Sequence, residues 1–300
     1  MRTFDYASFE TAAIPVEVKM YLSMIKEYKG KLQDLFMHKP GTLNQMIHYA
    51  TRKGAEASNR MEGISTTDKR LAALMDGKVK PAGRAEKEIL GYIYCLDLMR
   101  KNHDTFTFTP GDILKLHESL YRFSPTATSG YFKSEDTKTE TMSAECGDDE
   151  CGIREILNEE IIRPGGVKTV GFVPVSALDT QQAVQDLCDA YNRAIEKSTI
   201  SSLILSTQFV LDFLCIQPFL EGNGRMSRLL MIMLLYQNEY KAGKCISFEE
   251  MMEKTKGSYC DALRASTKYW HEDANDPWPF ISYMLGIILA AYRELENRSV

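Results

Sequence analysis

Apolar residues recur at spacings of three and four along most of the chain, which predicts a succession of helices. This spacing is found in nine segments: 15–35, 43–62, 84–101, 110–122, 178–196, 201–216, 224–240, 248–270 and 278–296. Two of their starts carry capping signals, Thr109-Pro110 and Asn223-Gly224. Apolar and polar residues alternate only in KTVGFVPVS at 168–176, which suits the edge of a short hairpin. The predicted fold is mainly α, with a small β-hairpin.

A long polar segment interrupts the helical pattern between Ser129 and Lys168. Acids and turn-forming residues dominate it, so we interpret 129–176 as a flap inserted between helices. Cys146 and Cys151 lie in this flap, in the sequence CGDDEC. A metal site would need further ligands, but no second cysteine pair has matching spacing and no histidine is near. An exposed acidic loop is therefore the preferred interpretation.

The composition is that of an ordinary soluble globular protein, with 300 residues, 44% of them apolar and 26% charged. The net charge of −5 gives no direct signal for nucleic-acid binding. The first residues lack the pattern of a signal peptide, and the longest apolar run, FISYMLGIILAAY, is too short to cross a membrane. Seven cysteines, an odd number, suit reduced thiols, so we expect a cytoplasmic protein.

The sequence FLEGNGRMSR lies between two predicted helices that are apolar almost all round. A polar loop between buried helices needs a physical reason. Gly222 and Gly224 allow the backbone to turn its N–H groups inward, and the start of the next helix adds the positive end of its dipole. Arg225 and Arg228 fall on one side of the first helical turn, where their guanidinium groups can bind anionic oxygens.

Glu221 is unexpected beside an anion site, because a carboxylate repels phosphate. A divalent cation between the two removes this conflict, and Mg²⁺ is the natural choice. Together these residues predict a polyphosphate site. The alternative is a plain turn between helices in which the arginines form surface ion pairs. No G-x-x-x-x-G-K-[ST] sequence occurs, and the loop lacks the third glycine and the preceding strand of a dinucleotide fingerprint.

This loop resembles the signature of the Fic (Fido) domain proteins, H-[PX]-F-x-[DE]-G-N-G-R-x-x-R. Eight residues match in register: Pro218, Phe219, Glu221, Gly222, Asn223, Gly224, Arg225 and Arg228. The sequence Ser129-Gly130-Tyr131 resembles the start of the family's target-docking flap, and VGFVPVS resembles its return. The C-terminal segment resembles the helical tail of many bacterial members.

The resemblance implies a Fic-type helical bundle that transfers AMP from ATP to a hydroxyl of a target protein. It divides the chain into an N-terminal helical region at 1–105, a Fic core at 106–240 and a helical extension at 241–300. In this scheme Glu221 would hold Mg²⁺ on the α- and β-phosphates. Gly222, Asn223 and Gly224 would cradle phosphate oxygens, and Arg225 and Arg228 would hold the β- and γ-phosphates. Phe219 would anchor the loop in the core.

A second motif, SNRMEGIST, resembles the self-inhibitory [ST]-x-x-x-E-[GN] pattern of some Fic proteins. Ser58 and Glu62 are one helical turn apart, and Gly63 can end the helix in a left-handed conformation. The inhibitory helix is predicted at about 43–62. By resemblance, Glu62 would pair with Arg228 and so block the γ-phosphate. The alternative is an ordinary solvated glutamate beside a glycine that ends a helix.

Gln217 departs from the family pattern, because it occupies the position of the histidine that accepts the proton of the target hydroxyl. An amide cannot accept that proton. Three interpretations remain open: a slow, self-inhibited adenylyltransferase, a nucleotide-binding regulator without activity, and a protein-interaction module. The implied partners are ATP and an unidentified target protein, and homo-oligomerisation is left open.

Overall fold

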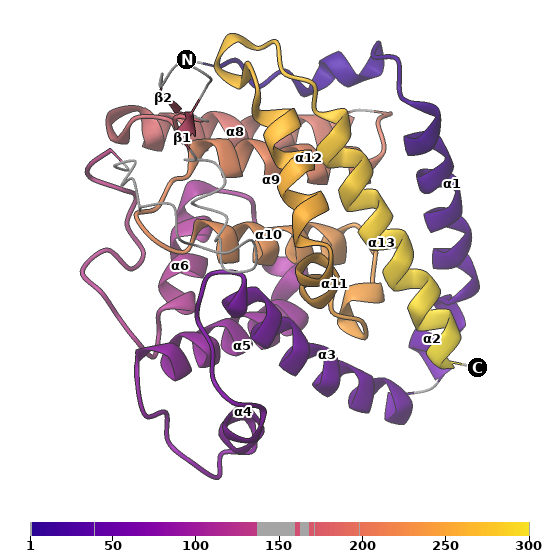
Figure 1. Cartoon of the computed structure of the whole chain (residues 1–300). Coiled ribbons are helices and arrows are strands. Elements are labelled where there is room, and N and C mark those ends of the chain that lie inside the picture. Colours follow the sequence, from indigo (N-terminus) through magenta and orange to yellow (C-terminus); the bar gives the residue numbers. More distant parts are fainter. Residues whose placement is uncertain are drawn as a thin grey trace.

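The structure is a computed structural model that describes residues 2–38, 40–136, 160–162, 168–170, 172–197 and 199–299. Helices dominate it, which confirms the mainly α class (Figure 1). The α-helices are α1 (Val16–Lys31), α2 (Gln33–His38), α3 (Pro40–Arg60), α4 (Asp68–Met75), α5 (Arg84–Asn102), α6 (Pro110–Leu120), α8 (Ala177–Lys197), α9 (Ser202–Ile216), α10 (Asn223–Gln237), α11 (Phe248–Lys254), α12 (Lys256–Thr267) and α13 (Trp278–Ser299). The 3-10 helices are η1 (Tyr6–Glu10), η2 (His103–Thr105), η3 (Ala242–Lys244) and η4 (Trp270–Glu272).

The helices α9 and α10 form the centre of the molecule. All residues of α9 from Leu203 to Ile216 are buried, and so are those of α10 from Gly224 to Tyr236. A helix that is apolar on every side must be surrounded by other elements. Here α9 packs against α8, α10, α12 and α13, while α10 also contacts α3 and α5 (Figure 1). The loop that joins α9 to α10 is therefore held between buried helices.

The N-terminal segment is tied to α9 through Asp212, a fully buried carboxylate. Asp212 accepts hydrogen bonds from the Tyr6 hydroxyl at 2.9 Å and from Trp270 Nε1 at 2.7 Å, and Arg2 Nε lies 3.4 Å from it. Burial raises the pKa of the Asp212 carboxyl. Since α1 also packs along α13, both ends of the chain close around the central helices (Figure 1).

Several helical segments differ from the sequence prediction, and the predicted helix at 15–35 divides into α1 and α2 at Leu32. The predicted helix at 248–270 is wrong, because it divides into α11 and α12 at Thr255, whose φ of −118° is not helical. The Thr255 hydroxyl donates to the carbonyl of Met251 at 2.9 Å, and the Thr255 N–H is shared between the carbonyls of Met251 and Met252, both at 3.2 Å. The short helix α4 was not predicted. It begins after Thr67, whose side chain caps its N-terminus.

The predicted flap at 129–176 contains two short antiparallel strands, β1 (Glu160–Ile162) and β2 (Lys168–Val170). Ile161 is opposite Thr169 in this pair. Cys146 and Cys151 lie outside the described residues. The division of the chain at 105 and 240, like the docking role of the flap, stays a prediction.

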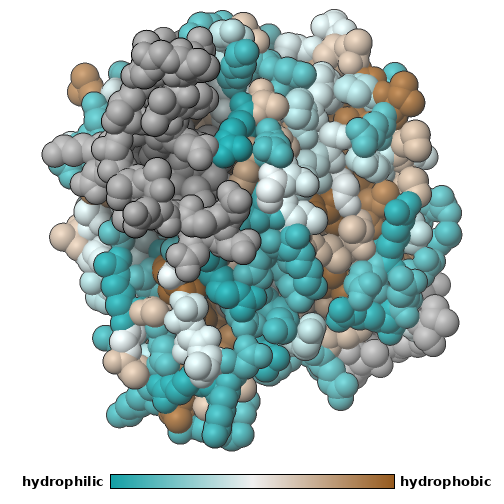
Figure 2. Space-filling view, in the orientation of Figure 1, coloured by the Kyte–Doolittle hydropathy of each residue, from teal (hydrophilic) through white to brown (hydrophobic). Residues whose placement is uncertain are grey.

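Within the described residues, no helix has the length and apolar character needed to span a bilayer. Among the residues coloured by hydropathy in Figure 2, hydrophilic ones predominate and strongly apolar ones occupy smaller areas. This distribution agrees with a core that is enclosed by the helices.

Candidate functional site

The loop between α9 and α10 is bounded by two residues in left-handed conformations. Gln217 ends α9 with φ 44° and ψ 67°, and Gly222 precedes α10 with φ 82°. Glutamine rarely adopts this conformation, whereas glycine adopts it freely. Gln217 is also 3% exposed, so the position that corresponds to the family histidine lies against the core.

Asn223 holds the loop in a closed turn. Its side-chain Oδ1 accepts from the N–H of Phe219 at 3.0 Å, and its Nδ2 donates to the Phe219 carbonyl at 2.7 Å. Both ends of the amide are thus used within the loop. The resemblance implied that Asn223 cradles phosphate oxygens. In this arrangement its side chain is used to hold the loop, so only its backbone N–H is available to bind a phosphate.

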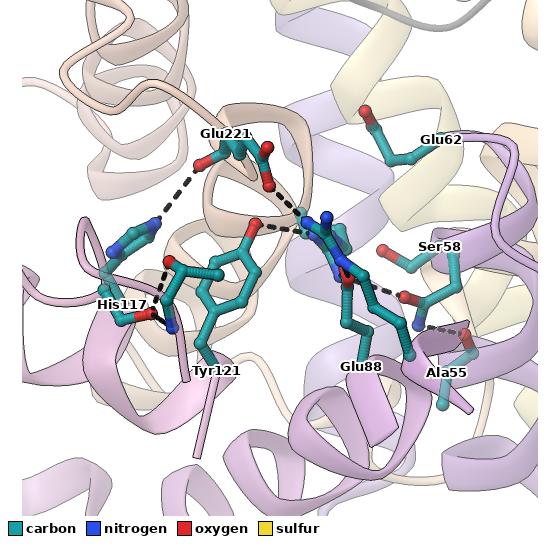
Figure 3. Close-up of polar contacts among 12 residues, drawn as sticks. Ala55, Ser58, Glu62, Glu88, His117, Tyr121 and Glu221 are labelled. Atoms are coloured by element: carbon teal, nitrogen blue, oxygen red, sulfur yellow. Dashed lines mark hydrogen bonds and ion pairs between the residues drawn. The ribbon is translucent and has the colours of Figure 1, made fainter. Parts of the chain in front are cut away.

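Phe219 anchors the loop from below. It is fully buried and stacks on His117 of α6, with ring centroids 3.7 Å apart and planes 2° from parallel. His117 Nδ1 accepts from the Gly130 N–H at 3.0 Å, so its Nε2 carries the proton and donates to the Glu221 carbonyl at 3.1 Å (Figure 3). Burial lowers the pKa of His117 to about 4. This neutral imidazole therefore fixes the loop and has no free nitrogen to act as a base.

Lys133 attaches the same loop to the segment that begins with Gly130 and Tyr131. Its N–H donates to the Pro218 carbonyl at 2.9 Å, and its Nζ donates to the Ile216 carbonyl at 3.1 Å. Burial lowers the pKa of Lys133 to about 8. Tyr131 is 68% exposed beside this attachment. Lys133 was missed by sequence reasoning, since a lysine next to a polar flap carries no sign of burial.

The backbone at the start of α10 presents free donors. Among the described residues, the N–H groups of Gly222, Asn223, Gly224 and Arg225 have no hydrogen-bond acceptor, and the first one used is that of Met226. Unused N–H groups at a helix N-terminus form an anion-binding arrangement, which the helix dipole reinforces. The expectation that glycines expose inward-turned amides fits this geometry.

Arg228 is buried in the next turn of α10 and is bound to the end of α3. Its Nε donates to Ser58 Oγ at 2.7 Å, and its Nη2 donates to the Ser58 carbonyl at 2.8 Å and to Glu62 Oε1 at 2.9 Å. The side chain of Arg228 is 1% exposed and that of Glu62 is 16% exposed. Figure 3 shows Ser58 and Glu62 on the same side of the site. The structure thus brings Ser58 and Glu62 of the second motif into contact with Arg228 of the loop signature.

The end of α3 differs slightly from the prediction. The helix spans Pro40–Arg60, so Glu62 lies in the following turn, and the predicted inhibitory helix at about 43–62 is displaced by two to three residues toward the C-terminus. Gly63 has φ 73°, and the N–H of Ile64 donates back to the Asn59 carbonyl at 2.9 Å. This closing bond is that of a glycine-terminated helix. It fixes the direction in which Glu62 leaves the helix.

Arg225 points toward α5 and α6, where it has partners that the sequence did not reveal. Its Nη1 lies 2.7 Å from Glu88 Oε2, and its Nη2 donates to the Tyr121 hydroxyl at 2.8 Å. A weaker bond joins it to Asn59 of α3 at 3.3 Å. Burial raises the pKa of Tyr121 to about 12, so its hydroxyl stays neutral. The one available signal was Glu88 itself, a glutamate among the apolar positions of a helix.

Glu221 faces Arg84, the first residue of α5. Arg84 Nη2 lies 2.5 Å from Glu221 Oε2, and Arg84 Nε lies 2.5 Å from Glu88 Oε1 (Figure 3). These contacts raise the pKa of Arg84, chiefly through its hydrogen bond to Glu88. Sequence reasoning assigned Glu221 to a metal and missed Arg84. No group of three or more metal-ligating side chains occurs in the part of the chain that the structure describes.

The sequence was compared with protein families and with known proteins. Residues 107–235 match the Fic/DOC family. A stretch of 82 residues is 37% identical to the ribonucleoside-diphosphate reductase small chain of Ostreid herpesvirus 1. That match covers 25% of this chain and 14% of the viral protein, so the activity of the viral protein is not transferred to this one.

Solved structures of Fic proteins resemble more than nine-tenths of the chain. A Fic family protein from Desulfovibrio desulfuricans G20 has a TM-score of 0.69 at 20% identity, over 95% of this chain and 76% of its own. A Fic domain containing signaling protein from Bacteroides thetaiotaomicron VPI-5482 has a TM-score of 0.67 at 18% identity, over 92% and 94%. Fic-1 (residues 134–508) from C. elegans has a TM-score of 0.63 at 15% identity, over 93% and 72%. The chain therefore has the Fic fold and carries a Fic/DOC family domain at residues 107–235.

Proposed function

We propose that this protein is a self-inhibited adenylyltransferase, which moves AMP from ATP to a hydroxyl of a target protein. The observation that carries the proposal is the start of α10, where four backbone N–H groups without an acceptor among the described residues adjoin the buried guanidinium groups of Arg225 and Arg228. Such a site suits the phosphates of a nucleotide. Glu62 is seated on Arg228, where a γ-phosphate would otherwise bind.

In the proposed reaction, the target hydroxyl oxygen attacks the α-phosphorus of ATP. A new O–P bond forms, the bond from the α-phosphorus to its bridging oxygen breaks, and pyrophosphate leaves. The hydroxyl proton must pass to an acceptor. The Gln217 amide is not a base, and both nitrogens of His117 already form hydrogen bonds, so the proton would pass to water. Loss of a general base typically slows a reaction by about 10²–10⁴-fold.

The proposed cofactor of the transfer step is Mg²⁺, which would lower the negative charge on the phosphates when bound. Mg²⁺ is often held by one or two carboxylates together with substrate phosphates, so Glu221 alone is an adequate protein ligand. Its Oε2 already pairs with Arg84, however. The residues therefore fit the ion only after Arg84 has moved away from Glu221.

A second candidate is a nucleotide-binding regulator that transfers nothing. The observation in its favour is Gln217, which replaces the base and lies in a strained left-handed conformation against the core. In this case Glu62 and ATP would compete for Arg228, and the outcome of this competition would control a protein partner.

Label transfer separates the two candidates. Glu62→Gly protein is incubated with ATP labelled on the α- or on the γ-phosphate, and protein-bound label is measured over hours. Slow labelling from α-labelled ATP alone supports AMP transfer. Tight ATP binding without any labelling supports the regulator. Labelling from γ-labelled ATP would instead point to phosphate transfer and contradict the proposal.

A further inference from the structure

We propose that the guanidinium group of Arg84 neutralises the Glu221 carboxylate in place of a metal ion, so that the loop binds nucleotide phosphates without a divalent metal. This inference rests on the proposed nucleotide site and concerns the binding step. Arg84 lies 137 positions before Glu221 in the chain, and nothing in the signature of the loop indicates it.

Arg84 is held in place by a buried group. Its Nη2 contacts Glu221 Oε2 at 2.5 Å, while its Nε contacts Glu88 Oε1 at 2.5 Å. The Glu88 side chain is 3% exposed, whereas those of Arg84 and Glu221 are 58% and 48% exposed. An isolated surface ion pair opens easily. Because Glu88 fixes the inner edge of the guanidinium, its outer edge stays directed at Glu221.

The charges around the start of α10 balance without an added ion. Glu88 and Glu221 each contribute one negative charge, and Arg84 and Arg225 each contribute one positive charge, so the four sum to zero. Glu221 would repel a phosphate that approached the free N–H groups of Gly222 to Arg225. Arg84 cancels this repulsion at its source, as a divalent cation would.

A divalent ion on Glu221 would also lie beside the Arg84 guanidinium. Two neighbouring positive charges repel each other, so the divalent ion would have to displace Arg84 from its bond to Glu221. The part of the chain that the structure describes offers no cluster of further ligands to compensate. Metal-free binding is therefore the favoured state of this site.

The test is the affinity for ADP, which has no γ-phosphate and so avoids competition with Glu62. Dissociation constants are measured by calorimetry in EDTA and in excess Mg²⁺, for the unmodified protein, Arg84→Gln and the control Lys87→Gln, which removes a positive charge from the same helix. We expect the unmodified protein and the control to bind equally well in both conditions, within about threefold. Arg84→Gln should bind ADP about tenfold more weakly in EDTA, because the Glu221 carboxylate then repels the phosphates without a neighbouring positive charge. Its ADP affinity should recover in Mg²⁺.

A second variant distinguishes charge compensation from a structural role. Adding Glu221→Gln to Arg84→Gln removes the carboxylate that needs a cation, so metal-free ADP binding should return. Failure of this rescue, loss of ADP binding by the unmodified protein in EDTA, or an Arg84→Gln variant that behaves like the control would each overturn the inference. If neither ADP nor ATP binds in any condition, even to Glu62→Gly, the proposed nucleotide site itself is wrong.

Discussion

Replacing Glu62 by glycine should tighten ATP binding much more than ADP binding. In the structure Glu62 accepts one hydrogen bond from Arg228 at 2.9 Å, and the arginine side chain is 1% exposed. A γ-phosphate that binds Arg228 must first break this contact. Hydrogen bonds to charged groups contribute roughly 1.5–3 kcal/mol. Removing the Glu62 carboxylate, which competes with the γ-phosphate for Arg228, therefore corresponds to about a tenfold to hundredfold gain in ATP affinity. ADP does not reach Arg228 in the proposed pose and should change by less than about threefold.

The same substitution should lower the stability of the nucleotide-free protein. Arg228 keeps its two bonds to Ser58 but loses its carboxylate, and a buried charge without its partner is costly. We expect a loss of about 1–3 kcal/mol, seen as a drop of a few degrees in Tm. Saturating ATP should reverse this drop, because the γ-phosphate supplies the missing negative charge.

Calorimetric titration with ATP and with ADP measures the first effect, and thermal unfolding measures the second. Glu253→Gly is the matched control, since Glu253 pairs with Arg60 at the same end of α3 but does not contact Arg228. The reasoning is refuted if ATP affinity stays the same, if ADP affinity rises as much as ATP affinity, or if the control gives the same gain.

Three further predictions concern residues that hold the loop between α9 and α10 in its conformation. The pKa of His117 is lowered to about 4, so the unfolded chain binds more protons than the folded one between pH 4 and pH 6.5, and the free energy of unfolding should fall by up to about 3 kcal/mol as the pH drops through this range. His117→Phe should flatten this pH dependence in denaturant titrations, and an unchanged slope would contradict the assignment. Asn223→Ala removes both bonds to the Phe219 backbone and should cost about 1–3 kcal/mol of stability and weaken ATP binding, whereas intact ATP affinity would show that the turn forms without it. Gly222→Ala should cost about 1–3 kcal/mol in thermal unfolding, because φ is 82° and the new Cβ would lie 2.9 Å from the Tyr121 hydroxyl, and a neutral result would show that this turn relaxes.

Local sequence patterns predicted the parts of the site that local physics determines. The apolar residues of α9 and α10 indicated buried helices, and the two glycines around Asn223 indicated a turn whose N–H groups face inward. Gly63 correctly indicated a left-handed end to α3. The mainly α class follows from the same periodicity, because the spacing of apolar residues is a property of neighbouring positions.

Contacts between distant segments could not be predicted in this way. The pairs Arg84–Glu221 and Glu88–Arg225 join α5 to the loop and to α10 across 137 positions, and no period links residues so far apart. The break at Thr255 was missed because the apolar spacing continues through it. Lys133 was missed because its burial depends on the loop that packs over it.

The most direct test of the proposed function is a cycle of four proteins: unmodified, Glu62→Gly, Gln217→His and the double variant. Each is incubated with α-labelled ATP, and the rate of AMP incorporation is measured by intact-protein mass and by label. We expect the double variant to exceed the product of the two single effects, because a base is useful only when the α-phosphate is aligned. Rapid AMP transfer by the unmodified protein, or a double variant that binds ATP tightly and transfers nothing, would contradict the account.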